Sequence, residues 1–161
     1  MVAVGLSVIV VTTSCSSDGS SVLDVNSLPD DERCLDVGEE VGALVTDLNW
    51  VPCESPDPAD DHTHEVYGVA DYFVVSEDNP ATTIKPGDYP GREALELFAQ
   101  AECFAAFERY VGISPLESAL FYSWLIPTLT SWENDGDREV LCVAGNANGD
   151  ALTQSIRGSQ R

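Results

Sequence analysis

Basic side chains are scarce in this sequence. It has 7 Lys and Arg against 28 Asp and Glu, which gives a formal net charge of −21. Nucleic acids and anionic lipid surfaces are polyanions and would repel such a chain. We therefore expect no nucleic-acid partner. The acids are most simply explained as a solvated surface, and a charge arranged to hold cations or a basic partner is the alternative.

Complete catalytic signatures are also missing. The chain contains no G-x-S-x-G and no H-E-x-x-H motif. The stretches NDGDRE and NANGD lack the Glu that closes the loop of an EF-hand. A Ser/His/Asp triad converges only in space, so the sequence leaves that alternative open. We expect a non-enzymatic protein without a cofactor.

Long hydrophobic runs are absent. Residues 2–11 are apolar, but a helix that spans a bilayer needs about 20 apolar residues. A short run followed by small residues is typical of a signal peptide. Because Cys15 comes directly after these small residues, the segment resembles a bacterial lipobox, in which the Cys is lipidated. An ordinary secretory signal with an incidental Cys is the alternative. The expected organisation is a lipoprotein-type signal peptide (1–14), a flexible tether (15–32) and one domain (33–161).

Four cysteines remain after Cys15 is set aside: Cys34, Cys53, Cys103 and Cys142. An even number in an exported chain predicts two disulfides, for which three pairings are possible. No two of these cysteines have the C-x2–4-C spacing of a zinc knuckle. The spacing therefore does not predict a zinc site.

The two histidines lie close together in the stretch DDHTHE. His62 and His64 are alternate residues, which project to the same side of an extended segment. With Asp60, Asp61 and Glu65 they are weak candidates for a transition-metal site. A solvated pair beside a loop is the simpler interpretation, so we expect no metal.

The strongest periodic segment covers residues 90–111. Asp88 is expected to cap its start and Gly112 to end it. Apolar residues recur at steps of three and four, which predicts a helix with one buried face. The residues expected on this face are Leu95, Ala99, Cys103, Ala106 and Tyr110.

The remaining pattern predicts strands and one short helix. Strands are expected within 41–51, 64–75, 120–126 and 138–144, with a bulge at Gly68. A short helix is expected from Pro127 to about Gly136. The order predicts an α+β fold, a small antiparallel sheet packed against one long helix and a short helix. Cys103, on the inner face of the long helix, is expected to meet Cys142 in a strand beneath it.

Aromatic residues concentrate in the second half of the chain. Most are expected in the core, and a partly exposed groove for a peptide or glycan is the alternative. The residues concerned are Tyr110, Phe121, Tyr122, Trp124 and Trp132.

Eight short pieces, in this order and spacing, resemble the septum formation domain of actinobacterial membrane and lipid-anchored proteins. They are Cys34-Leu35, VPC (51–53), HTHEV (62–66), YPG (89–91), C-x3-F-x2-YVG (103–112), PTLTSW (127–132), GDREVLC (136–142) and SIRG (155–158). The resemblance covers nearly all of the expected domain. It implies an extracytoplasmic, non-enzymatic module of the cell envelope, associated by family name with septum formation.

The sequence therefore predicts a binding or scaffold module on the outer face of the cytoplasmic membrane. Its partners would be the membrane, through a lipid on Cys15, and an envelope or division protein. The alternative function is a wall-associated metal-binding protein or hydrolase that uses His62, His64 and the neighbouring acids. A third possibility is a secreted domain without an anchor.

Overall fold

A computed structural model describes residues 33–36, 48–54, 61–72 and 87–161. The expected signal peptide, Cys15 and the tether lie outside these residues. The described strands are β1 (Cys34–Leu35), β2 (Trp50–Val51), β3 (His64–Asp71), β4 (Leu120–Leu125) and β5 (Glu139–Asn146). The helices are α1 (Arg92–Val111) and α2 (Leu129–Asn134).

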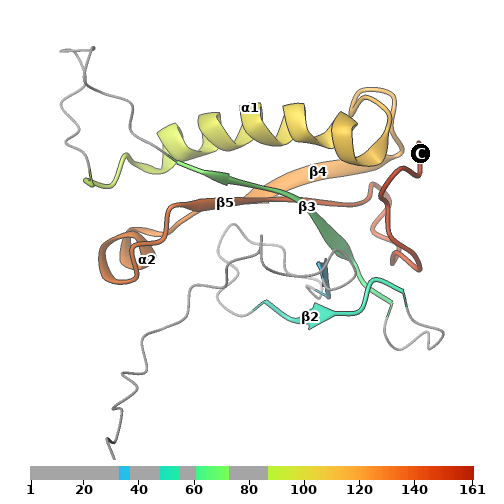
Figure 1. Ribbon diagram of the computed structural model, residues 1–161, viewed down its shortest axis with the longest axis horizontal. Coiled ribbons are helices and arrows are strands. Elements are labelled where there is room, and N and C mark those ends of the chain that lie inside the picture. The colour runs from blue at the N-terminus through green and yellow to red at the C-terminus, as the bar shows by residue number, and fades with distance from the viewer. Residues whose placement is uncertain (1–32, 37–47, 55–60, 73–86) are drawn as a thin grey trace, which may run out of the picture.

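The strands form one sheet in the order β2-β1-β3-β5-β4, and every described pair is antiparallel. The long strands β3 and β5 lie at its centre, and α1 runs along one face (Figure 1). This architecture, with two disulfides, confirms the predicted α+β fold. The strand β1 was not predicted, because a strand of two residues is too short to show an alternating pattern.

α1 follows the predicted spacing. Its buried residues are Leu95, Ala99, Cys103, Phe107, Tyr110 and Val111. Ala106, expected among them, is only partly buried. Gly112 ends the helix in the left-handed conformation with φ 88°, and its N–H bonds to the carbonyl of Glu108.

The predicted start of α1 is wrong. The residue at the N-cap is Gly91, which has φ 92° and makes no side-chain capping bond. The N-cap position therefore belongs to Gly91 and not to Asp88. A left-handed residue between Pro90 and Arg92 delays the helical conformation, and this turn is not visible in the apolar spacing.

The main core lies between α1 and the sheet. Phe107 and Val140 are fully buried there, with Tyr67 beside them. Burial of one such large side chain stabilises the fold by about 1.5–3 kcal/mol. A smaller cluster of Leu35, Val66 and Val143 covers the opposite face.

β3 and β5 approach each other closely. The register of the pair shifts between Val66 and Gly68, which confirms the predicted bulge. Facing the start of β3, Gly145 leaves no room for a side chain, because a Cβ there would lie 2.6 Å from the carbonyl oxygen of Thr63.

α2 connects β4 to β5. The Thr128 side chain accepts a hydrogen bond from the Ser131 N–H and completes a capping box. Trp132 is buried, and its indole N–H donates to the carbonyl of Gly87 at 2.8 Å. The guanidinium of Arg138 lies 3.6 Å from the centre of the Trp132 ring.

Among the helices of the described residues, none combines the length and the apolar character that crossing a bilayer requires.

Candidate functional site

Glu65 is the centre of a buried polar cluster in the described structure. It lies on β3, opposite Cys34 of β1 and Ala144 of β5, and its side chain has 0 % of its surface exposed. Tyr67, two residues later, packs in the main core, so Glu65 faces α1. An acid at this inward position is the signal that could have identified the site from the sequence.

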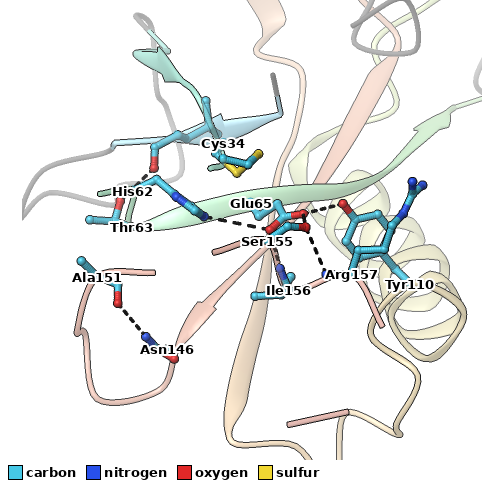
Figure 2. Close-up of polar contacts among 12 residues, drawn as sticks. Cys34, His62, Thr63, Glu65, Tyr110, Asn146, Ala151, Ser155, Ile156 and Arg157 are labelled. Atoms are coloured by element: carbon cyan, nitrogen blue, oxygen red, sulfur yellow. Dashed lines mark hydrogen bonds and ion pairs between the residues drawn. A yellow bond between two sulfur atoms is a disulfide. The ribbon is translucent and has the colours of Figure 1, made fainter. Parts of the chain in front are cut away.

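Three donors satisfy the Glu65 carboxylate (Figure 2). The Tyr110 hydroxyl donates to Oε1 at 2.5 Å, and the Ser155 hydroxyl donates to the same oxygen at 2.8 Å. The backbone N–H of Ile156 donates to Oε2 at 2.7 Å. Because all three partners donate, the arrangement suits an ionised carboxylate, which is an acceptor only.

The cluster joins three distant parts of the chain. Tyr110 lies in the last turn of α1, whereas Ser155 and Ile156 belong to the segment that follows β5. The guanidinium of Arg157 lies 5.0 Å from the centre of the Tyr110 ring. The carboxylate therefore fastens the C-terminal segment and the end of α1 to the centre of the sheet.

Burial changes the chemistry of the two core tyrosines. It raises the pKa of Tyr110, and the hydrogen bond to Glu65 raises it further. The pKa of Tyr67 is raised mainly by burial. Tyr67 donates to the carbonyl of Cys103 at 2.9 Å. Both hydroxyls therefore stay protonated and act as donors rather than as nucleophiles.

His62 lies at the edge of this cluster. Its backbone forms a bridge with Leu152, and its side chain has 1 % of its surface exposed. Nε2 lies 4.0 Å from Glu65 Oε2, too far for a hydrogen bond, and has no other partner among the described residues. Burial lowers the pKa of His62 to about 4, so the ring is neutral at neutral pH.

His64 lies in a different environment. Its Nδ1 is 3.0 Å from the Thr63 hydroxyl, and its ring packs edge-on against Phe121 with centroids 5.5 Å apart. Its Nε2 has no hydrogen-bond partner in the described structure, and burial lowers its pKa. His64 and Glu65 are consecutive residues of β3, so their side chains project to opposite faces of the sheet. Because Glu65 faces α1, His64 faces away from it.

The expectation that both histidines lie in solvent is wrong, because each is buried. The expectation that they project to the same side is also wrong. The chain bends at Thr63, so only His62 reaches the Glu65 carboxylate. Of the neighbouring acids proposed as ligands, Asp60 lies outside the described residues.

The cysteines form the pairs Cys34–Cys53 and Cys103–Cys142, with Cα atoms 5.0 and 5.2 Å apart. The second pair links α1 to β5, as expected from the inward position of Cys103. The first pair lies beside the cluster: the two sulfurs and a carboxylate oxygen of Glu65 are all within 4.8 Å of one another.

The Ser155 hydroxyl does not meet a histidine. It donates to Glu65, whereas in a Ser–His relay the hydroxyl donates to the imidazole. The contacts of Ser155 are those of a side chain that holds a carboxylate in place.

The aromatic residues are divided between core and surface. Tyr110 and Trp132 are buried, and Tyr122 and Trp124 are partly buried against the main core. Phe121 is exposed over 37 % of its surface.

A separate hollow of about 220 Å³ lies between α1 and β3, beside Gly68, and Glu102 and Arg109 form part of its wall.

No protein-family model, no curated protein and no solved structure matches the chain.

Proposed function

We propose that the protein is an exported, lipid-anchored binding or scaffold module of the cell envelope, linked to septum formation. The observation that carries the proposal is the pair of disulfides, which together join β1 to the segment after β2 and α1 to β5. Disulfides form and persist in oxidising compartments outside the cytoplasm. The apolar run followed by Cys15 supplies the export signal and the site of the lipid.

The proposed link to septum formation is supported by the positions of the sequence pieces that resemble the septum formation domain. HTHEV contributes His62 and Glu65, YVG contributes Tyr110, and SIRG contributes Ser155 and Ile156. These pieces are far apart in the sequence and meet at one buried carboxylate. Such convergence is expected of residues that define a fold.

A binding role is favoured over catalysis by how the polar groups are used. Both oxygens of Glu65 accept hydrogen bonds from the chain itself, and the carboxylate has no exposed surface. A general acid or base must reach the proton that it transfers. Glu65 is therefore a structural group in this proposal.

Export is tested by trapping thiols in intact cells with a maleimide that adds mass. We expect the endogenous protein to resist labelling until a reductant is added, because Cys34, Cys53, Cys103 and Cys142 are paired. Full labelling of cytosolic protein without reductant would contradict the proposal.

Anchoring is tested by detergent partitioning of the wild type and of Cys15→Ser. We expect the wild type in the detergent phase and the variant in the aqueous phase, because stable anchoring depends on the buried acyl chains. A wild type that stays aqueous would show a secreted domain without an anchor.

The binding role is tested by crosslinking in the intact organism, followed by identification of envelope or division proteins. The matched enzymatic test uses purified protein, wall fragments and the variant His62→Ala with His64→Ala. Hydrolysis by the wild type that the variant loses would overturn the non-enzymatic proposal.

A further inference from the structure

A buried nitrogen without a partner marks one corner of the sheet. His62 Nε2 lies inside the protein, 4.0 Å from Glu65 Oε2, and no described residue hydrogen-bonds to it. Burial of a polar atom without a partner costs free energy. Such an atom in a native fold points to a ligand or to a second state of the site.

Two sulfurs lie beside the same carboxylate. The Sγ atoms of Cys34 and Cys53 and an oxygen of Glu65 lie within 4.8 Å of one another, and all three residues are buried. While the sulfurs are bonded to each other, neither is a thiolate. A disulfide sulfur is a poor metal ligand, so the oxidised site is closed to metal.

We propose that opening the Cys34–Cys53 disulfide converts this corner into a zinc site, in which the two thiolates, Glu65 and His62 are the ligands. Sulfur, imidazole nitrogen and carboxylate oxygen are the donors that Zn²⁺ accepts, and four of them complete a tetrahedral site. The sequence could not predict this set, because its members come from β1, the segment after β2, the bridge residue His62 and β3.

The conversion has two chemical steps. A dithiol reductant cleaves the S–S bond by exchange, gives two protons and two electrons to the cysteines, and closes its own disulfide. Zn²⁺ then binds and releases the two thiol protons to solvent, because the metal ligand is the thiolate. A disulfide oxidant reverses the exchange: it takes two electrons from the two thiolates, is itself reduced to thiols, and Zn²⁺ is released as the Cys34–Cys53 bond forms.

The surroundings hold the Glu65 carboxylate in place beside the sulfurs. Tyr110, Ser155 and the Ile156 N–H fix the Glu65 carboxylate, in the manner of outer residues that orient metal ligands. Cys34 pairs with Glu65 across β1 and β3, which keeps its sulfur near the site after reduction.

The test reduces the purified protein with a water-soluble phosphine, removes the phosphine by anaerobic gel filtration and titrates the protein with Co²⁺ and then Zn²⁺. We expect one equivalent of Co²⁺ to give a thiolate-to-cobalt charge-transfer band, and Zn²⁺ to displace it. The oxidised protein should show no band. A reduced chain that gains neither metal nor metal-dependent structure would overturn the proposal.

Variants separate this site from the other thiols. Cys34 and His62 are direct ligands in this proposal, and loss of even an outer partner of a ligand costs about 10–100-fold in affinity. Cys34→Ser and His62→Asn should therefore weaken Zn²⁺ binding by at least about 10-fold. His64→Asn is the matched control, because His64 faces away from the sulfurs, and it should bind like the wild type. Unchanged binding in Cys34→Ser would place the metal on Cys103 and Cys142 and overturn the proposal.

Discussion

A carboxylate with no exposed surface is stable only if donors inside the protein replace the water that it loses. Glu65 meets this requirement with two hydroxyls and one backbone N–H. These bonds involve a charged acceptor, so each is stronger than a bond between neutral groups. At the scale of single residues, the buried Glu65 carboxylate therefore depends on donors from α1 and from the segment after β5.

Glu65→Gln is expected to destabilise the fold by about 2–3 kcal/mol, because the amide removes the charge and turns one acceptor into a donor. Tyr110→Phe should cost less, about 1–2 kcal/mol, since Ser155 still donates to the same oxygen. Urea unfolding measures both. Glu102→Gln, on the exposed side of α1, is the control and should change stability little. Equal stability of Glu65→Gln and this control would show that the cluster does not stabilise the fold.

His62 predicts a loss of stability in acid. Its folded pKa of about 4 lies below its ordinary value of 6.5, because burial opposes the charge. The neutral ring therefore favours the fold above pH 6.5, and this contribution falls as the pH drops from 6.5 towards 4, because the unfolded chain takes the proton first.

His62→Gln should remove roughly 2–3 kcal/mol of this dependence. The measurement is the free energy of urea unfolding of the oxidised wild type and of the variant. It is repeated at several pH values that cover the range between the two pKa values of His62, 6.5 and about 4. Parallel curves would mean that His62 does not titrate differently in the two states.

At the scale of elements, each helix depends on its ends. Thr128 caps α2 through its side chain, so Thr128→Ala should destabilise the protein by about 1 kcal/mol. Thr130→Ala, exposed in the same helix, is the matched control. Chemical denaturation followed by the fluorescence of Trp132, which is buried in α2, reports both. An equal loss in the two variants would assign the effect to helix propensity and not to the cap.

The long elements could be predicted from the sequence because their periods are local. The three- and four-residue spacing located α1, and the enrichment in β-branched and aromatic residues located β3 and β4. The start of α1 could not be located in this way, because Gly91 sets it through its backbone conformation. β1 exists through its pairing with β2 and β3, which no two-residue pattern reveals.

The site was predicted less well than the fold, for the same reason. The acids near His62 suggested solvent, yet a backbone bridge to Leu152 covers this residue. Glu65 was named only as a neighbouring acid, whereas its donors come from α1 and from the segment after β5. These contacts are determined by tertiary structure and have no local signature.

At the scale of the whole molecule, the two disulfides hold different layers together. Cys103–Cys142 joins α1 to the sheet and closes 39 positions of chain, whereas Cys34–Cys53 joins two segments at the sheet edge and closes 19. A disulfide of this kind stabilises a small domain by about 3–4 kcal/mol on the chain-entropy account. The longer loop adds about 0.6 kcal/mol for each doubling of length.

The variant Cys103→Ala with Cys142→Ala should therefore be the less stable of the two double variants. It also removes buried side chains from the main core. The difference is measured by thermal unfolding of this variant and of the double variant Cys34→Ala with Cys53→Ala. The opposite order of stability would mean that the edge of the sheet holds the fold together more strongly than the helix layer does.

The contacts of Glu65 with the segment after β5 impose an order on folding, because a ribosome makes the chain from its N-terminus. β3 is made early, but Glu65 lacks its bonds from Ser155 and Ile156 until that later segment has been made. A nascent chain that stops after β5 therefore has a buried carboxylate without two of its three donors. Truncation before Ser155 should disturb the centre of the sheet and not merely shorten the protein.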